Sequence, residues 1–246
     1  MIKFFILVFL SLNIYSEYKI TVLATNIANF GGYGEWSFSA LYESEDESIL
    51  FDTGFHEDTV LHNAKVLNKD LSKVKKVVLS HFHSDHTGGL IKLRKTYREF
   101  NNDAFSIVYV ARGFFDQRYA KDGHMEGPGN FKYSQEFKKA AELEGIKFII
   151  LDDYELIAKN LYATGTVPRT VESYNGPKGY FLDSNLSIPD VIKDDQSLGM
   201  LTDRGWVMMS GCGHSGIINT AKKLQSIKDL PCLLYTSDAA DDTCCG

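Results

Sequence analysis

The chain has 246 residues, of which 44% are hydrophobic and 13% aromatic, which is enough to bury a large core within one domain. Its formal net charge is −6, and no dense run of lysine and arginine occurs. Such a composition offers no cationic surface for phosphate backbones, so we expect no nucleic-acid partner and a small-molecule substrate instead.

The amino-terminal segment, residues 1–16, has the pattern of an export signal. Lys3 precedes an apolar run at residues 4–12, and small or polar residues follow. The run is too short to span a bilayer, and no cysteine near its end offers a lipid attachment. A buried first strand is the alternative. The pattern predicts a signal peptide, and hence a periplasmic or secreted product with no membrane span after its removal.

Apolar and β-branched runs predict strands, and apolar residues at helical spacing predict helices. The predicted strands are residues 20–24, 38–42, 48–51, 74–79, 105–110, 148–151 and 206–209. The predicted helices are residues 57–67, 90–97 and 134–143. This mixed order of strands and helices predicts an α/β fold and not a strand-only sandwich.

Two stretches, residues 113–133 and 174–189, have no clean period and are rich in glycine and aromatics. The first resembles a lid or a substrate loop. Its aromatic and histidine side chains either stack on a substrate ring or pack into the core. They are Phe114, Phe115, Tyr119, His124, Phe131 and Tyr133.

The end of the chain, residues 235–246, has neither periodicity nor a helix cap and resembles translated adapter sequence more than protein. We therefore predict one domain at residues 17–234, with a non-native tail in place of the natural carboxy-terminal part. All four cysteines lie at or after Cys212, which is no framework for a small disulfide-bonded scaffold.

Chemistry-bearing residues gather directly after the predicted strand at residues 74–79. Residues 81–86 read His-x-His-x-Asp-His. Residues two apart in extended backbone point to the same side, so His81 and His83 can bind one metal ion. Asp85 and His86 fall on the following turn, where they can serve a second ion about 3.5 to 4 Å away. Packing explains such a density of ligand residues poorly, so the motif predicts a metal centre.

This motif resembles the signature of the metallo-β-lactamase superfamily. The upstream Asp52-Thr53-Gly54, after an apolar run, is similar to another hallmark of that superfamily. The resemblance implies a metallo-β-lactamase-like αββα sandwich, truncated here at its carboxy terminus. It also implies that Asp52 orients the metal ligands by hydrogen bonding and does not bind metal itself.

Residues 163–169, 194–198 and 210–220 make the resemblance more specific. They resemble a subgroup that includes the archaeal dihydropterin ribofuranosylaminobenzene phosphate synthase and many metal-dependent hydrolases. The resemblance runs from about residue 18 to residue 230.

This resemblance also implies roles for individual residues. It makes His214 a further metal ligand. Cys212 is either a ligand or a small buried thiol, and Asp195 either binds metal or hydrogen-bonds to a ligand. Arg169 either clamps an anionic substrate group or forms a structural ion pair.

Two departures from the subgroup stand out. Its relatives close the site with a last histidine near the carboxy terminus, yet no histidine follows His214. Residues 111–114 read Ala-Arg-Gly-Phe where the subgroup often has a His-Pro pair.

The expected function is hydrolysis of an ester, thioester, lactone, amide or phosphoester by a metal-activated water. His81, His83 and His214 would hold one ion, and Asp85 and His86 the other, with Asp85 also steering or accepting a proton. Two zinc ions are the expected cofactor, with iron, manganese or magnesium as alternatives.

Two other functions remain open from the sequence. One is a pterin-pathway-like synthase, a transferase that releases pyrophosphate, for which an exported location is unfavourable. The other is a metal-binding protein without turnover, motivated by the missing last histidine. The sequence predicts neither the substrate nor the oligomeric state.

Overall fold

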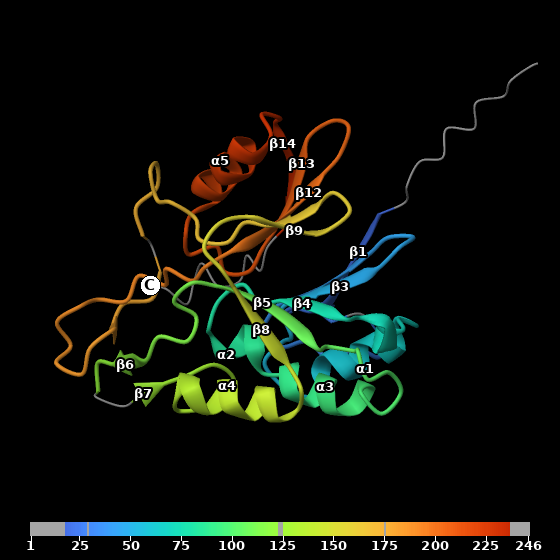
Figure 1. Ribbon diagram of the computed structural model, residues 1–246, viewed down its shortest axis with the longest axis horizontal. Helices are drawn as coiled ribbons and strands as arrows, with labels where there is room; N and C mark the ends of the chain where they lie inside the picture. Colours follow the sequence, from blue (N-terminus) through green and yellow to red (C-terminus); the bar gives the residue numbers. More distant parts are fainter. Residues whose placement is uncertain (1–17, 29, 123–124, 175, 237–246) are drawn as a thin grey trace, which may run out of the picture.

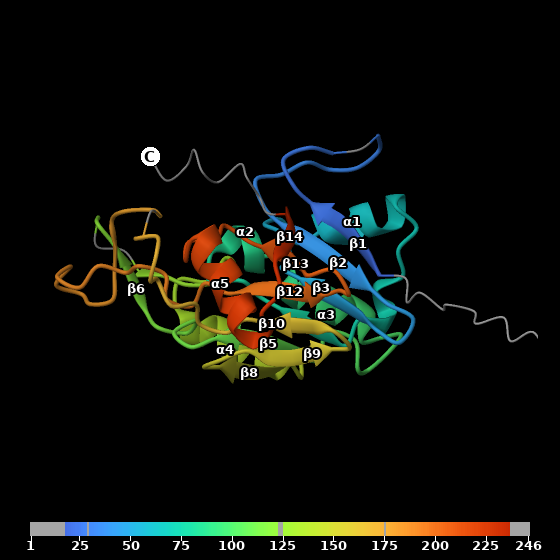
Figure 2. The ribbon, with the colours of Figure 1, turned by 90° about the horizontal axis from the view of Figure 1, so that it is seen from above.

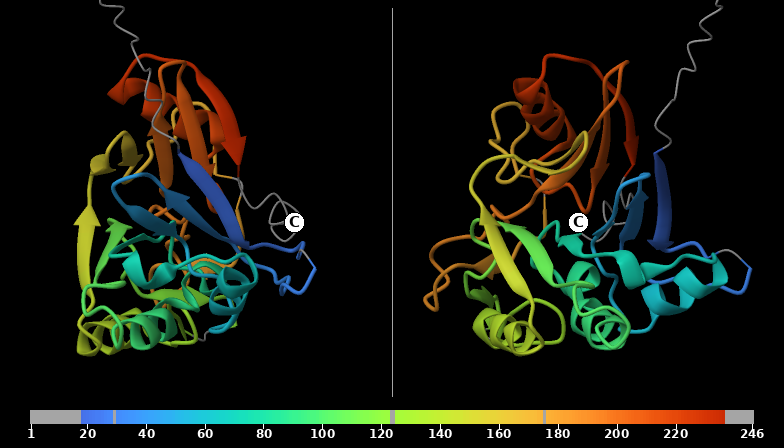
Figure 3. Two further views of the ribbon diagram at one scale, coloured as in Figure 1. Left: turned by 90° about the vertical axis from the view of Figure 1, so that its right-hand side faces the viewer. Right: turned by 45° about the vertical axis from the view of Figure 1, so that its right-hand side comes forward.

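The computed structural model describes residues 18–28, 30–122, 125–174 and 176–236. Two stacked sheets lie between helices, so the layers follow in the order helix, sheet, sheet, helix (Figures 1 and 3). This confirms the predicted αββα sandwich. The expected signal peptide lies outside the described residues, as do residues 237–246 of the expected tail. None of the helices in the described part is long and apolar enough to cross a membrane.

The first sheet has six strands in the order β1-β2-β3-β4-β5-β8. Their bounds are β1 Lys19–Ala24, β2 Ser39–Glu43, β3 Ser48–Phe51, β4 Lys76–Val78, β5 Ile107–Ala111 and β8 Lys147–Leu151. The first three strands pair antiparallel, and β3, β4, β5 and β8 run parallel. Every one of these strands overlaps a predicted run.

Helices α1 (Thr59–Val66), α3 (Leu90–Tyr97) and α4 (Ser134–Leu143) cover the outer face of this sheet, at the bottom of Figure 1. Each lies within a segment predicted as a helix. A short 3-10 helix, η1 (Leu71–Lys73), precedes β4, and the short helix α2 (Ser84–Thr87) follows it.

The second sheet has five strands in the order β14-β13-β12-β10-β9. Their bounds are β9 Glu155–Ala158, β10 Leu161–Ala163, β12 Ser197–Leu201, β13 Trp206–Ser210 and β14 Cys232–Thr236. Helix α5 (Ile217–Ile227) covers its outer face (Figure 2). Strand β14 pairs in parallel with β13 and runs to Thr236, two residues beyond the expected domain end at residue 234.

Three buried clusters fill the three interfaces between the four layers. The first sheet contributes side chains to two of these clusters, and β3 shows how. Its Leu50 packs toward the helices, while the neighbouring Ile49 and Phe51 face the second sheet. A strand that is buried on both faces has a continuous apolar sequence, which is why these runs were readable. Trp206 and Leu224 lie in the third cluster, under α5.

The two irregular stretches meet in space. Strands β6 (Arg118–Ala120) and β7 (Met125–Glu126) come from the first stretch, and β11 (Tyr180–Phe181) comes from the second. They form a small sheet in the order β11-β6-β7, at one end of the sandwich, where Figure 1 labels β6 and β7. Phe114 from the first stretch is buried in the core, whereas His124 lies outside the described residues.

Candidate metal centre

The His-x-His-x-Asp-His segment leaves β4 at the edge where the two sheets meet. His81 directly follows the extended segment and is fully buried, and His83 is the residue before the first turn of α2. Asp85 and His86 lie within α2. The imidazole ring of His81 has its centroid 4.4 Å from the rings of both His83 and His86.

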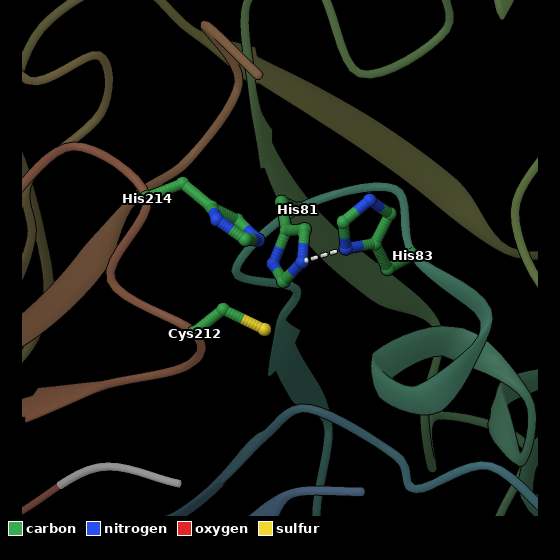
Figure 4. A group of neighbouring side chains, drawn as sticks. All are labelled: His81, His83, Cys212 and His214. Atoms are coloured by element: carbon green, nitrogen blue, oxygen red, sulfur yellow. Dashed lines mark hydrogen bonds between the residues drawn. The ribbon is translucent and has the colours of Figure 1, made fainter. Parts of the chain in front are cut away.

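A second loop, after β13 of the other sheet, brings Cys212 and His214 to the same place. Figure 4 shows their side chains converging on His81 and His83. The ring of His214 lies 4.8 Å from that of His81 and 5.2 Å from that of His83. Residues more than 120 positions apart in the sequence therefore share one cluster.

The ligand atoms form two groups. One group contains His81, His83, Cys212 and His214, and the other contains Asp85, His86 and Cys212; within each group all ligand atoms lie within 4.8 Å of one another. Cys212 belongs to both groups, so its thiol lies where the two meet. Its sulfur is 3.1 Å from Nε2 of His86, which also lies 3.1 Å from a carboxylate oxygen of Asp85.

Asp52 orients this cluster through hydrogen bonds and is not itself one of the grouped ligand residues. It is fully buried, and its carboxylate accepts hydrogen bonds from the backbone N–H of Ser80 at 2.7 Å and from the Ser80 hydroxyl at 2.8 Å. It also lies 2.7 Å from Nδ1 of His86. With Nδ1 of His86 donating to Asp52, Nε2 presents a lone pair toward Cys212 and Asp85, as a metal ligand requires.

Burial keeps two of the histidines in the neutral form that binds metal. It is the largest cause that lowers the pKa of His81 well below its usual value, and the neighbouring imidazoles of His86 and His83 add to it. The pKa of His214 is lowered in the same way, by burial first and then by His83 and His86.

Asp85 is held as a carboxylate. Burial alone would raise its pKa, but the adjacent imidazoles of His86 and His83 outweigh burial and hold the pKa of Asp85 well below its usual range. A carboxylate that is ionised at neutral pH suits a cation ligand.

The loop that carries Cys212 and His214 depends on close packing. A Cβ at Gly211 would lie 2.4 Å from Oγ of Ser80, so only glycine lets this loop approach the metal-binding segment. Asp195 braces the same loop, because its Oδ2 accepts a 2.7 Å hydrogen bond from the backbone N–H of Ser215. Asp195 is in neither group of ligand atoms that the described residues form, and its other oxygen, Oδ1, is buried without a hydrogen-bond partner. Whether Asp195 binds metal stays a prediction.

Sequence reasoning missed two residues that support the segment carrying His81 and His83. Asp194 accepts a hydrogen bond from the backbone N–H of Phe82, between His81 and His83, at 3.0 Å. Its other oxygen accepts from Arg118 of β6 at 2.6 Å, and the Arg118 guanidinium lies 3.7 Å above the Phe82 ring. The only signal in the sequence was the Asp-Asp pair at 194–195, and the sequence does not indicate which residues these carboxylates contact.

Arg169 lies against the backbone of a neighbouring segment. Its Nη2 donates to the carbonyl oxygens of Val191 and Ile192, and its guanidinium lies 5.4 Å from the Tyr174 ring centre. It is not among the residues that line the cavity beside the cluster. Its expected role as an anion clamp stays a prediction.

A cavity of about 340 Å³ opens beside the cluster. Its lining combines ligand residues with side chains from the small sheet and from loops of the first sheet. The lining residues are Trp36, Phe55, Phe82, His83, Ser84, Asp85, Glu126, Gly127, Pro177, Tyr180, Cys212 and His214. This volume falls in the range of small-molecule sites.

The residues present fit a divalent metal. Within the described part of the chain, Nε2 of His214 is buried and has no hydrogen-bond partner. A buried polar atom without a partner is costly, and metal coordination would satisfy it. Imidazole, thiolate and carboxylate are together a donor set suited to zinc.

Comparisons with known proteins agree with this geometry. The family model of the metallo-beta-lactamase superfamily matches residues 36–99, which span Asp52 and the histidine motif. An uncharacterised protein of Methanocaldococcus jannaschii is 31% identical over 213 residues, covering 85% of this chain and 76% of its own length.

A second relative from the same organism is named 7,8-dihydropterin-6-methyl-4-(beta-D-ribofuranosyl)-aminobenzene-5'-phosphate synthase. It is 27% identical over 216 residues, covering 83% of this chain and 71% of its own length. Among solved structures, a metal-dependent hydrolase of the beta-lactamase superfamily superposes with a TM-score of 0.69 at 27% identity. That match covers 90% of this chain and 76% of the other.

Proposed function

This chain belongs to the metallo-beta-lactamase superfamily, and we propose from this premise that it is a metal-dependent hydrolase of an ester, thioester, amide or phosphoester. One observation carries the proposal, namely the convergence of histidine, cysteine and aspartate ligand atoms from both halves of the sandwich beside a cavity of ligand size.

The two groups of ligand atoms support the proposed roles of the ligand residues. His81, His83, Cys212 and His214 would hold one divalent ion, zinc by the donor set, and Asp85, His86 and Cys212 would hold a second. A divalent ion there supplies Lewis acidity, which polarises the scissile group and makes water a nucleophile near neutral pH.

The other residues prepare the site for this chemistry. Asp52 keeps the proton of His86 on Nδ1, so that Nε2 stays a ligand atom. Asp85 adds a negative charge that offsets part of the charge of a bound cation. Trp36 and Phe55 line the cavity with apolar surface, which limits the water that reaches a bound substrate.

The test is a hydrolase screen on protein of defined metal content. Zinc-loaded protein should hydrolyse at least one member of a panel of simple esters, thioesters, amides and phosphoesters. Chelation should abolish the activity, and zinc should restore it. His83→Asn should abolish it as well, while His62→Asn, whose imidazole stacks on Tyr33 outside the cavity, should retain it.

A pterin-pathway-like synthase is the second candidate, and the similarity to the archaeal synthase favours it. Incubation with pterin pyrophosphate separates the two candidates. Release of pyrophosphate together with inactivity on the whole hydrolase panel would replace hydrolysis by the transferase reaction. Full metal binding without either reaction would identify a metal-binding protein that lacks turnover.

A further inference from the structure

Two aromatic residues of the cavity wall come from segments that one buried carboxylate joins. Trp36 lies in the segment before β2, and Phe55 follows β3, three residues beyond Asp52. Glu35, directly before Trp36, is only 9% exposed. A buried carboxylate is costly unless hydrogen bonds satisfy it, so its partners show which groups it holds in place.

The Glu35 carboxylate accepts four hydrogen bonds from three segments. Its Oε1 accepts from the Ser37 hydroxyl at 2.6 Å and from the backbone N–H of Phe55 at 2.8 Å. Its Oε2 accepts from the backbone N–H of His56 at 3.1 Å and from the Thr59 hydroxyl at 2.7 Å. These donors match the about four acceptor positions of a carboxylate. Glu35 therefore joins the segment before β2, the turn after β3 and the start of helix α1.

The same turn is fastened to helix α2, which carries two of the proposed ligand residues. The backbone N–H and the hydroxyl of Thr53 both donate to the carbonyl oxygen of His86, at 2.8 and 3.0 Å. A Cβ at Gly88 would lie 1.9 Å from the carbonyl oxygen of Phe55, so the turn and the end of α2 are in direct contact. The turn therefore has a fixed position relative to the candidate metal centre.

Glu35 extends this constraint to Trp36. The indole is 39% exposed, so packing into the core does not hold it alone. Its two neighbours in the chain are anchored, because Glu35 is bonded to the turn and the Ser37 hydroxyl is bonded to Glu35. A wall that is ordered before a ligand arrives loses less conformational entropy on binding.

We propose that Glu35 is a positioning residue that holds Trp36 and Phe55 as a wall for an uncharged apolar group of the substrate. Indole and phenyl surfaces bind such a group by apolar burial and ring contacts. The substrate is then an ester or amide with an uncharged apolar group next to the bond that is broken. The placement of that bond at the metal centre rests on the proposed hydrolase function, whereas the action of Glu35 on the wall does not.

Benzamide tests the wall because it combines an uncharged ring with an amide. Calorimetry on the metal-free and the zinc-loaded protein measures its dissociation constant. Glu35→Gln replaces one oxygen by an amide nitrogen, which cannot accept from the two donors that bonded to that oxygen. This variant should weaken benzamide binding roughly threefold to tenfold. Glu57→Gln, the same substitution at an exposed acid of the same turn, is the matched control and should leave the dissociation constant unchanged.

A double-variant cycle shows whether Glu35 acts through Trp36. Trp36→Leu should weaken benzamide by a similar factor, and Glu35→Gln should then add less than it does alone. Trp36→Phe keeps a ring and should retain most of the affinity. Acrylamide should also quench the fluorescence of Trp36 more easily in Glu35→Gln, and the other tryptophan, Trp206, is fully buried in a different cluster.

Kinetics separate positioning from a general loss of structure. For any substrate that the hydrolase screen identifies, Glu35→Gln should raise KM roughly threefold to tenfold and leave kcat within about twofold. Bound zinc per chain should equal that of the wild type, because no proposed ligand residue changes. A merely structural role of Glu35 would lower kcat and the zinc content together.

The outcomes are separable from those of the hydrolase screen. Absence of benzamide binding to the wild type, equal affinity in Glu35→Gln, or fully additive losses in the double variant would overturn the proposal even if hydrolysis is found. Weakened binding in Glu35→Gln but not in Glu57→Gln supports it even if no hydrolysis is detected. If Glu35→Gln does not fold, as judged by its melting curve, Thr59→Val takes its place. It removes one hydrogen bond to Glu35 and should weaken benzamide by a smaller factor.

Discussion

At the scale of single residues, Asp52 combines full burial with an unusual backbone conformation. Its φ of +57° is in the left-handed region, which aspartate and asparagine tolerate better than most residues. From there its carboxylate reaches both Ser80 and His86. Burial raises its pKa, and the hydrogen bonds from His86 and Ser80 oppose that rise.

Asp52→Asn should therefore weaken metal binding without changing the local shape. The new amide nitrogen would face Nδ1 of His86 and donate to it, which moves the histidine proton to Nε2 and removes a ligand lone pair. We expect a loss of roughly 10- to 100-fold in zinc affinity and of about 3 kcal/mol in the free energy of unfolding. Competition with a chelator measures the zinc affinity, and urea denaturation measures the free energy of unfolding. Asp152→Asn, at an exposed surface pair, is the control, and equal zinc affinity in both variants would contradict this role.

The lowered pKa values of His81 and His214 lead to a prediction for the pH dependence of metal retention. Protons compete with metal for imidazole only below the imidazole pKa, and an ordinary histidine titrates near pH 6.5. Because burial lowers both pKa values, the neutral ligands persist at more acidic pH. Bound zinc per chain, measured by elemental analysis after dialysis, should stay constant from about pH 8 to about pH 6 and fall only below that. Half-release at about pH 6.5 or above would show that these imidazoles titrate as exposed ones do.

The sequence contained enough information for the contiguous part of the site but not for its supports. His81, His83, Asp85 and His86 are near neighbours in the chain, so their shared chemistry is visible as a motif. Asp194 reaches Phe82 across 112 positions, and no local pattern encodes that hydrogen bond. Tertiary packing alone brings such residues together.

At the scale of elements, the two irregular stretches form the small sheet, and one arginine of that sheet links it to the metal-binding segment. Arg118 of β6 is 1% exposed and donates to carboxylates of Asp190 and Asp194 at 2.9 and 2.6 Å. It also donates to the carbonyl oxygens of Phe114 and Asp116. Burial raises the pKa of Asp194 to about 6, and the Arg118 charge opposes that rise.

Removal of this guanidinium should destabilise the fold. Arg118→Met leaves two buried carboxylates without their cation, so we expect a loss of about 3 to 5 kcal/mol in the free energy of unfolding. Arg118→Lys keeps the positive charge but not the planar guanidinium. Its loss in the free energy of unfolding should therefore be smaller than that of Arg118→Met. Urea denaturation measures all three proteins. Arg112→Met breaks an exposed ion pair and serves as control, and a loss no larger in Arg118→Met than in this control would refute the bracing role.

Strand length decided which elements could be predicted. The apolar runs of β3 and β8 are continuous over several residues, whereas β7 and β11 have two residues each, too few to establish a period. The hairpin of β9 and β10 turns at Asn160, whose φ is +60°, but its Lys-Asn pair is a weak turn signal. These short strands form because a neighbouring strand pairs with them, and the local sequence does not indicate which segment that neighbouring strand is.

At the scale of the whole molecule, the metal centre lies across the boundary between the two halves of the sandwich. His81, His83 and His86 follow a strand of the six-stranded sheet, while Cys212 and His214 follow a strand of the five-stranded sheet. Direct contacts already join the halves at this edge, since the backbone N–H of Gln196 donates to the carbonyl oxygen of Ser80 at 2.9 Å. A metal ion bound by ligands from both sides would add a further connection between the halves, which the unfolded chain cannot form.

Metal loading should therefore stabilise the entire domain and not only the loops at the site. A ligand at one hundred times its dissociation constant adds about 2.7 kcal/mol to the free energy of unfolding. In a domain of this size each kcal/mol raises the melting temperature by about 2 to 4 °C, so zinc should raise it by about 5 to 10 °C in calorimetry. His214→Asn removes one of the two ligands on the side of the five-stranded sheet and leaves Cys212, so it should lose a large part of this shift. If the zinc-loaded protein melted at the temperature of the chelator-treated one, the cluster would not be joining the two sheets through a metal.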